Sequence, residues 1–493
     1  MYRWTVPGQD RLDIPFGVEL RTDNRWVQFA RIMPWEKIES LYSANFNEVK
    51  GQVAKPSRLA FGALFVQWRL GLTDEETVDQ IRENPSIQYF CGYESYTTEK
   101  PFDKTLMVHF RKRITSEMMK EIAKEAFAEE ARKAVVGRDA PGAPDEDDDS
   151  DGSSGTSGET GGDSVGRDTL GAPKGTMLLD ATCCPADIHY PTDINLLNHA
   201  RELTEQIIDK LHEQLAKPGI EKPRTYRNVA RAAYLSFAKR RKYMAAQLRQ
   251  AIRQQLQYVR RNLDTIAKQV GQGADLVELG KELYKKLLVI SELYRQQKLM
   301  YDGRTHKVEG RIVSISQPHL RPIVRGKSNA PVEFGAKVAT ARIGGFTFVI
   351  HLDYDNFQEA KYLIESAEEY KRIFGFYPGA IIGDRAYGTR ENRNYCKSRG
   401  IRLSGPGLGR KTEEIKEAER KQNYQDGCVR NAVEGDYGTG KRKYGLDRIM
   451  AKLDNTTFTA ISFGFFVKNM ERLRSIMSAK PARAALQTVN SHD

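Results

Sequence analysis

The sequence predicts a mixed α/β protein in which an all-α N-terminal domain precedes a mixed sheet, and a helical insertion follows the first strand of that sheet. Three observations carry this prediction. The first 137 residues contain helix signals, the second half alternates short apolar runs with amphipathic stretches, and residues 196–305 have a helical pattern. The length of 493 residues allows about three domains, and ordinary apolar content, 40%, allows a sizeable core.

The N-terminal domain is predicted from local helix signals. Thr73 and Glu76 have the spacing of a capping box, which opens a helix at 75–82. Asn84 stands before Pro85, and proline favours the first helical position, so a further helix begins there. Other helices are predicted at 35–46, at 57–70 and from residue 102 onward.

The helix that begins near residue 102 carries the basic cluster Arg111, Lys112 and Arg113. Short helices joined by tight turns are compatible with a helix-turn-helix-like DNA reader. We therefore expect this domain to recognise DNA ends through these three residues. The alternative is a plain helical bundle that serves dimerisation.

Acidic residues are concentrated in one segment. Residues 139–163 hold nine acids and no Lys or Arg, and Ser, Gly and Pro fill the gaps. Such a segment cannot bury enough apolar surface to offset the entropy lost on ordering. We therefore expect a disordered acidic linker at 138–170.

Basic residues are concentrated in another segment. Residues 222–263 hold twelve Lys or Arg and no acid, among apolar residues at helical spacing. We expect one long helix, or two, with a basic face that includes Lys239, Arg240, Arg241 and Lys242. A solvated helix surface is the alternative, but such surfaces normally mix both signs. An unmixed stripe would bind phosphates without reading sequence, and the net charge of +12 also indicates a polyanionic partner.

The second half predicts the elements of the sheet. His351 ends one of its strands, where it is more simply a structural histidine than a residue that orients water. Strands are expected at 177–182, 311–315, 332–341, 346–351, 380–384 and 401–403, and helices at 357–373, 391–399 and 411–422.

Three acids stand out by their positions. Asp180 ends the apolar run at 176–180, Asp384 ends the run at 380–384, and Glu434 follows in a separate stretch. Carboxylates at the ends of buried strands can converge from distant parts of a sequence. Convergent carboxylates hold hard cations such as Mg²⁺, and paired Mg²⁺ ions cut and join phosphodiester bonds.

The residues leave alternatives for these positions. Asp187 or Asp193 can replace Asp180 as the first ligand, although neither ends an apolar strand. Asp436 can replace Glu434. An isolated Asp at a strand end is often only a turn former.

Three stretches of sequence resemble a known family. They are Leu-Asp-Ala-Thr at 179–182, Gly-Asp-Arg-Ala-Tyr-Gly at 383–388, and Arg-Asn-Ala-Val-Glu-Gly at 430–435. The chain resembles the DDE transposases of bacterial insertion sequences, of the insertion-sequence-five type, and its N-terminal helices resemble the domain that usually precedes their core. The resemblance implies a ribonuclease-H-like catalytic core.

The resemblance also implies a site and a reaction. Asp180, Asp384 and Glu434 would be the catalytic residues and would bind two Mg²⁺ ions, with Mn²⁺ as a substitute. The enzyme would cleave insertion-sequence ends and transfer the strands into target DNA, by phosphodiester hydrolysis and transesterification. Its partners would be double-stranded DNA, at terminal inverted repeats and target sites, and a second copy of the chain in a homodimer.

The third motif fits the family at two further positions. The family places an Arg four residues before the Glu and a Lys seven after it, and Arg430 and Lys441 fit as DNA-binding residues. The family's Tyr slot, three residues before the Arg, holds Gly427 here, and Tyr424 is displaced.

Three glycines in this motif disfavour a helix. Gly435, Gly438 and Gly440 lie between Glu434 and Lys441. Because glycine costs about 1 kcal/mol in a helix interior, this run argues against one unbroken helix that carries both residues.

Cysteine spacing and hydropathy indicate the compartment. The five cysteines form no C-x-x-C pair, so their spacing suggests neither a zinc ribbon nor a disulfide framework. No apolar run approaches a membrane span, and the N-terminus lacks a signal-peptide core. We expect a soluble, cytoplasmic bacterial protein that associates with the nucleoid when it binds DNA.

Two other classes of function remain open. One is a divalent-metal DNA nuclease of the same fold that cuts without joining, and the other is an inactive DNA-binding protein descended from a transposase. The predicted boundaries are a helical N-terminal domain at 1–137, the acidic linker at 138–170, a catalytic core at 171–195 and 306–475, the basic insertion at 196–305, and a tail at 476–493.

Overall fold

The computed structural model describes residues 19–47, 53–136, 175–215, 221–324, 332–407, 409–410 and 412–489, with side chains as far as 479. The acidic linker lies outside the described residues. The chain divides into two compact units. Unit 1 is Met1–Cys184, Lys337–Asp353 and Phe357–Asp493, and unit 2 is Pro185–Ala336 and Tyr354–Asn356. The predicted domain boundaries stay a prediction.

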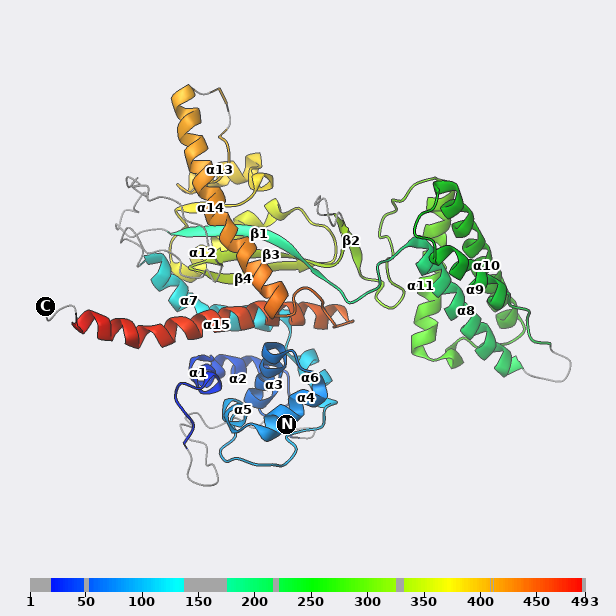
Figure 1. Cartoon of the computed structure of the whole chain (residues 1–493), viewed down its shortest axis with the longest axis horizontal. Helices are drawn as coiled ribbons and strands as arrows, with labels where there is room; N and C mark the ends of the chain where they lie inside the picture. Colours follow the sequence, from blue (N-terminus) through cyan, green and yellow to red (C-terminus); the bar gives the residue numbers. More distant parts are fainter. Residues whose placement is uncertain are drawn as a thin grey trace. The chain divides into compact units, whose positions relative to one another are not determined.

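Unit 1 begins with helices, as the local signals predict. Thr73 Oγ1 accepts the Glu76 N–H at 3.2 Å, and the Glu76 carboxylate accepts the Thr73 N–H at 2.8 Å, so the capping box is confirmed. Asn84 caps the helix that begins at Pro85. The helices are α1 (Arg25–Ile32), α2 (Trp35–Ser43), α3 (Ser57–Leu70), α4 (Asp74–Glu83), α5 (Pro85–Phe90), α6 (Leu106–Arg113) and α7 (Ser116–Val136) (Figure 1).

Among the described residues, the mixed sheet has six strands in the order β2 (Arg321–Val324)–β3–β1–β5–β6, and β4 pairs with β3. The strands β1 and β5 are parallel, as are β5 and β6, whereas β3 and β4 are antiparallel. This arrangement confirms the mixed α/β fold with a ribonuclease-H-like core. The strands are β1 (Thr176–Pro185), β3 (Val332–Ile343), β4 (Phe346–Asp353), β5 (Ala380–Ile382) and β6 (Arg402–Leu403).

The strand predicted at 311–315 is wrong. These residues form no strand, and a short strand, β2 (Arg321–Val324), instead pairs with the first residues of β3. Ile312 and Ile315 are buried against the helices of unit 2, and the Ile312 N–H donates to Gln296 Oε1 at 2.9 Å. The apolar run packs as a loop onto a helix, and periodicity alone cannot distinguish this from a short buried strand.

Helix α15 joins the N-terminal helices to the sheet. It contacts α3, α7 and β4, and one hydrophobic core runs through all of these elements (Figure 1). The Phe61 and Phe463 rings lie 5.2 Å apart, and the Phe127 and Phe346 rings stack at 5.3 Å. The helical elements after β4 are η2 (Glu359–Tyr362), α12 (Leu363–Phe374), η3 (Arg385–Tyr387), α13 (Arg390–Ser398), α14 (Glu413–Lys443) and α15 (Asp454–Val489).

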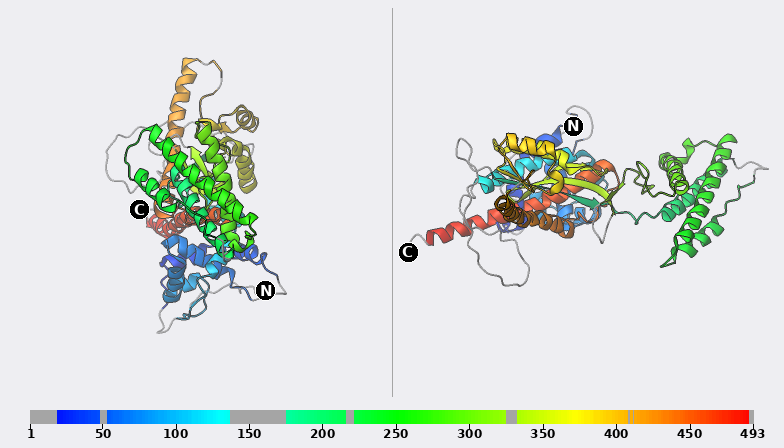
Figure 2. Two further views of the ribbon diagram at one scale, coloured as in Figure 1. Left: turned by 90° about the vertical axis from the view of Figure 1, so that its right-hand side faces the viewer. Right: turned by 90° about the horizontal axis from the view of Figure 1, so that it is seen from above.

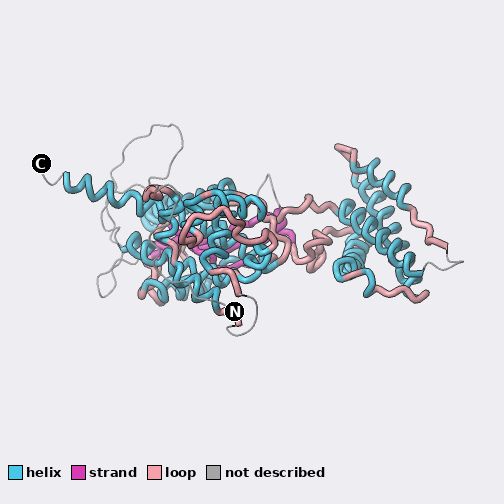
Figure 3. The backbone as a smooth tube through the Cα atoms, turned by 90° about the horizontal axis from the view of Figure 1, so that it is seen from below, coloured by secondary structure: helices cyan, strands magenta, loops and turns pink. Residues whose placement is uncertain are grey.

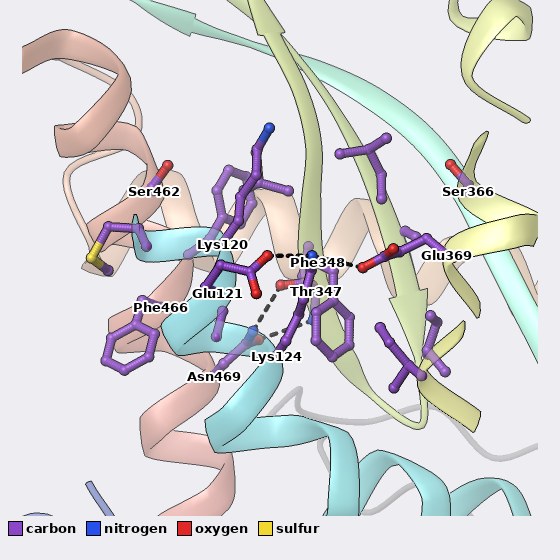
Figure 4. A pocket seen from close by; sticks show the side chains of 18 of the residues that line it. Lys120, Glu121, Lys124, Thr347, Phe348, Ser366, Glu369, Ser462, Phe466 and Asn469 are labelled. Atoms are coloured by element: carbon purple, nitrogen blue, oxygen red, sulfur yellow. Dashed lines mark hydrogen bonds and ion pairs between the residues drawn. The ribbon is translucent and has the colours of Figure 1, made fainter. Parts of the chain in front are cut away.

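Polar contacts also attach α7 to the core. Lys124 Nζ lies 2.7 Å from Glu121 on its own helix and 2.7 Å from Glu369 on α12 (Figure 4). On the α15 side, the Asn469 amide donates to the Thr347 carbonyl at 2.7 Å and accepts the Thr347 N–H at 3.0 Å. The last N-terminal helix is therefore part of the wall that supports β4.

Unit 2 is mainly helical (Figures 2 and 3). Its helices pack on two apolar clusters, one around Val259 and Ile290 and the other around Ile207 and Ile266. They are α8 (Asp193–Leu215), α9 (Arg227–Ala238), α10 (Ala245–Gly271), η1 (Val277–Leu279) and α11 (Lys281–Asp302). None of the described helices, in either unit, is long and apolar enough to cross a membrane.

The helix α14 corrects the prediction drawn from the glycines, because it runs unbroken through Glu434 and Lys441. A Cβ on Gly440 would lie 2.8 Å from Leu446 Cδ1, and one on Gly464 would lie 2.5 Å from Leu446 Cδ2. Leu446 is 1% exposed and fills the space that these two glycines leave. Tertiary packing therefore compensates for the poor helix propensity of this stretch.

This packing predicts opposite effects for two glycines on the same helix. Gly440→Ala should lower the free energy of unfolding of unit 1 by about 1 kcal/mol or more, because the methyl group overpacks against Leu446. Gly435→Ala should raise it by about 0.5–1 kcal/mol, because nothing lies within 4 Å of its Cβ position. Urea unfolding followed by tryptophan fluorescence reports on unit 1, which contains all four Trp. Equal effects would contradict the packing argument.

Candidate active site

The register of two parallel strands places Asp180 and Asp384 side by side. Leu178 on β1 pairs with Ile382 on β5, and each Asp lies two residues beyond its member of that pair. Neighbouring strands are roughly 5 Å apart, so Asp180 and Asp384 lie side by side. The expectation that a strand ends at Asp180 is wrong, because β1 continues to Pro185, whereas Asp384 follows the last residue of β5 in the turn. The convergence expected from the apolar runs follows from this register.

Asp180 is largely buried among other acids. Its side chain is 13% exposed, and Oδ1 accepts the Ala181 N–H at 2.8 Å. The pKa of Asp180 is raised to about 6, mainly by burial and to a smaller extent by nearby Glu359 and Asp384, whereas the Ala181 N–H and Arg430 act in the opposite direction. An acid in this setting carries negative charge that the surrounding residues compensate only in part.

The turn after β5 fixes Asp384. Its Oδ1 accepts the Ala386 N–H at 2.8 Å, so it caps the short helix η3. Tyr387 at the end of η3 is buried, and its ring folds back over Gly383, where a Cβ would lie 2.6 Å from Tyr387 Cδ2. The Gly-Asp-Arg-Ala-Tyr motif is thus a tight turn that only glycine permits at its first position.

Helix α14 brings the third motif to Asp180. Arg430 Nε lies 3.7 Å from Asp180 Oδ2, and Arg430 Nη2 lies 4.0 Å from Glu434 Oε1. Glu434 is 68% exposed, and half-buried Lys441 follows seven residues later, close to the same stripe of the helix. Arg430 therefore stands between the acid on the sheet and the acid on the helix.

The described residues contain no group of three or more His, Cys, Asp or Glu side chains close enough together to hold a metal ion. Asp180 and Asp384 come together, whereas Glu434 is connected to Asp180 only through Arg430.

Glu359 is a site residue that the sequence did not single out. It raises the pKa of Asp180, is 18% exposed, and lies 2.8 Å from Lys337 Nζ. The Asn392 amide donates to the carbonyls of Ala360 and Tyr387, at 2.9 and 3.0 Å, and so ties η2 to η3 beside Asp384. Glu359 neither ends an apolar run nor belongs to a motif, so no sequence signal pointed to it.

Asp436, the alternative to Glu434, has structural partners. Its Oδ2 lies 3.0 Å from Arg342 Nε and 2.7 Å from Lys468 Nζ, and it accepts the Thr347 hydroxyl at 2.9 Å. The neighbouring Tyr437 hydroxyl hydrogen-bonds Thr340 Oγ1 at 2.7 Å. These contacts attach α14 to β3, β4 and α15.

The other acids and the histidine have separate surroundings. Asp193 begins α8 in unit 2 and accepts hydrogen bonds from Arg311, at 2.7 Å, and from Gln297, at 2.8 Å. Asp187 also belongs to unit 2 and is half-buried. His351 on β4 stacks on Tyr362 with ring centroids 4.3 Å apart, in keeping with a structural histidine.

Two family models match this chain. One, described as "Transposase DDE domain", matches residues 381–471, and the other, "Transposase domain (DUF772)", matches residues 17–113. One curated protein matches, an uncharacterised protein of Rhizobium meliloti, "ORF8 in nfe locus", at 34% identity over 98 residues. The match covers 20% of this chain and 47% of that protein, so it spans about half the length of the relative. No solved structure matches.

The chain carries a transposase DDE domain behind an N-terminal transposase domain. The resemblance to DDE transposases of the insertion-sequence-five type is confirmed. The first match contains Asp384, Arg430, Glu434 and Lys441, whereas Asp180 lies outside both matched ranges.

The basic residues of the transposase's N-terminal cluster differ in their partners. Arg111 lies 2.6 Å from Asp74, and the Arg113 guanidinium lies 4.7 Å from the Phe46 ring centroid. Lys112 is exposed and forms no ion pair with a described residue.

The second basic cluster lies between two helices. Lys239, Arg240, Arg241 and Lys242 connect α9 to α10, and all four are exposed. The basic segment forms two helices, and the cluster occupies their connection, so the expectation that it lies on a helix face is wrong. Four like charges in a row favour a bend over a continued helix.

The pKa of Asp180 predicts a pH-dependent stability. A carboxyl with a folded-state pKa of about 6 and an unfolded value near 4 destabilises the fold as pH rises through that interval. Without divalent metal, Asp180→Asn should therefore raise the free energy of unfolding by about 1–3 kcal/mol near pH 8 and by little near pH 4. Glu434→Gln, at an exposed site, is the matched control and should change neither value. A pH-independent effect of Asp180→Asn in urea unfolding would contradict this assignment.

Proposed function

We propose that this transposase cleaves DNA at insertion-sequence ends and transfers the strands into target DNA in a metal-dependent reaction. Asp180, Asp384 and Glu434 are the proposed catalytic residues. The observation that carries the proposal is the pair of aspartates at matched register positions, Asp180 within β1 and Asp384 just beyond the parallel strand β5, with Arg430 and Glu434 of α14 near Asp180.

The surroundings of Asp180 fit a divalent cation. Burial raises the pKa of Asp180, and the nearby carboxylates of Glu359 and Asp384 act on it in the same direction. Carboxylate oxygens are the ligands that Mg²⁺ prefers, and Mn²⁺ accepts the same donors. Asp180 and Asp384 would hold the proposed two ions, with Glu434 as the ligand from α14. Bound ions would make the attacking oxygen more nucleophilic and stabilise the leaving oxygen.

The other residues of the site have roles in binding and orientation. Arg430 and Lys441 lie near one stripe of α14, and their cationic groups suit contact with DNA phosphates on either side of Glu434. Arg430 also offsets the charge of Asp180, which keeps that carboxylate ionised for metal binding. The capped turn at Asp384 and the Asn392 contacts limit the freedom of the carboxylates before substrate arrives.

Substitution of each proposed catalytic residue tests the reaction. Asp180→Asn, Asp384→Asn and Glu434→Gln each remove one ligand charge at nearly constant size, so each should lower cleavage and strand transfer at least about 100-fold. Binding to insertion-sequence ends should remain, because phosphate contacts come from Lys and Arg. Mg²⁺ or Mn²⁺ should be required, whereas Ca²⁺ should support binding only. Gel assays of end cleavage and of joining measure both steps.

Asp187→Asn is the matched control, since this half-buried acid belongs to unit 2. Asp436→Asn is unsuitable as a control because it disturbs a buried ion-pair network. If Asp187→Asn is inactive and Asp180→Asn is active, the first metal ligand is Asp187 and not Asp180. Wild-type protein that cuts ends without joining them to target DNA would instead be a nuclease, and protein that binds without cutting would be an inactive descendant.

The four cations between α9 and α10 test the proposed DNA contact of unit 2. Replacement of Lys239, Arg240, Arg241 and Lys242 by Gln should weaken binding to all DNA sequences similarly. The slope of log affinity against log salt should become shallower by up to about 0.9 per lost phosphate contact. Fluorescence anisotropy over a salt series measures both quantities. Unchanged affinity and slope would show that the cluster is only a solvated surface.

A further inference from the structure

Two large apolar side chains are exposed next to the cations that connect α9 to α10. Tyr243 is 49% exposed and Met244 is 68% exposed, and they directly follow Lys239, Arg240, Arg241 and Lys242. None of these four cations forms an ion pair with a described residue. A surface that served only phosphates would need the charges but not the exposed ring and thioether.

The Tyr243 ring is held in place from one side. Its centroid lies 4.9 Å from that of Phe237, at an interplanar angle of 43°, and Phe237 is only 8% exposed. Phe237 belongs to the last turn of α9 and is one of its two buried residues, so this ring supports one side of the tyrosine, which stays half exposed. A supported ring loses little entropy when it stacks on a further planar group.

Met244 is the N-cap residue of α10, and its N–H donates to Gln247 Oε1 at 3.0 Å. The first turn of this 27-residue helix contains no acid, and Ala245 and Ala246 are small and exposed. The positive end of the helix dipole therefore adds to the charge of the four cations, and the small side chains let a phosphate backbone come close.

We propose that the corner formed by residues 237–246 binds DNA at a distorted step, where Tyr243 and Met244 contact an unstacked base while Lys239–Lys242 hold the flanking phosphates. This inference rests on the proposed function only because it takes DNA as the ligand. It adds contacts with a base to the contacts with phosphates. Apolar wedges beside cations are how proteins stabilise kinked duplexes, and aromatic side chains stack on unpaired bases of any sequence.

Charge complementarity decides between DNA and a protein partner. A second copy of this chain would bring an equal cluster of cations to a symmetric interface, and these would repel one another. The acid-free stretch at 222–263 leaves no carboxylate of its own to compensate. DNA offers phosphates for the four cations and the faces of bases for Tyr243 and Met244.

Binding of full-length protein in Ca²⁺ to two duplexes of equal length, one fully paired and one with a single-base bulge labelled with 2-aminopurine, tests the proposal. Wild type should prefer the bulged duplex by about 5- to 100-fold, as one stacked base would give, and should quench the label. Tyr243→Ala with Met244→Ala should lose the preference and the quenching but keep the affinity for paired DNA and the salt slope. Tyr243→Phe should keep the preference, the quenching, the affinity for paired DNA and the salt slope.

Two further variants separate the contributions. The Gln replacements at 239–242 should weaken binding to both duplexes and keep their ratio. Val277→Ala with Leu288→Ala removes two apolar residues elsewhere in unit 2 that are 78% and 56% exposed, and it should change nothing. The proposal is overturned if Tyr243→Ala with Met244→Ala keeps the preference, if it changes the oligomeric state instead, or if the Val277 and Leu288 control loses the preference equally. Because the assay needs no cleavage, protein that prefers the bulge yet never cuts refutes only the proposed reaction.

Discussion

One ion-pair network attaches α14 to the sheet and to α15, in addition to the Arg402–Asp426 ion pair that attaches it to β6. Asp436 contacts Arg342 of β3 and Lys468 of α15, and it accepts a hydrogen bond from Thr347 of β4. Burial lowers the pKa of Lys468 to about 8, and Asp436 opposes that shift. Loss of a partner from such a network costs about 3–5 kcal/mol, because a buried charge is left uncompensated. The network therefore holds the helix that carries Arg430 and Glu434 in one rotation against the sheet.

Two independent constraints then meet at Asp180. The parallel register of β1 and β5 determines where Asp180 and Asp384 lie, and the α14 network determines where Arg430 approaches them. The strand register depends on backbone hydrogen bonds, whereas the position of α14 depends on side-chain contacts of Asp436, two residues after Glu434. The acid that anchors α14 is thus distinct from the acid proposed for catalysis, although the sequence presents them as near-equivalent neighbours.

The sequence was sufficient where local chemistry decides the structure. The Thr73 capping box, the Asn84 cap and the apolar runs that end at Asp180 and Asp384 need no knowledge of the rest of the chain. It was insufficient where a distant residue decides. Residues 311–315 form a loop because Ile312 and Ile315 pack on helices, and α14 continues unbroken because Leu446 packs against its glycines. Asn392 holds the residue next to Glu359. Local periodicity reveals none of these partners.

A count of cations in the sequence overstates the charge that DNA can meet. Arg111 forms an ion pair with Asp74, and Arg227 forms one with Asp209, so these acids neutralise much of the positive charge. In the part of unit 2 that the structure describes, the connection from Lys239 to Lys242 is different, because its charges have no acidic partner and stand next to Tyr243 and Met244. Charge without an internal partner retains its full attraction for phosphates at short range, while paired charge is screened before a ligand arrives. The unpaired cations, rather than the total of +12, therefore mark the surface at which we propose that the protein binds DNA.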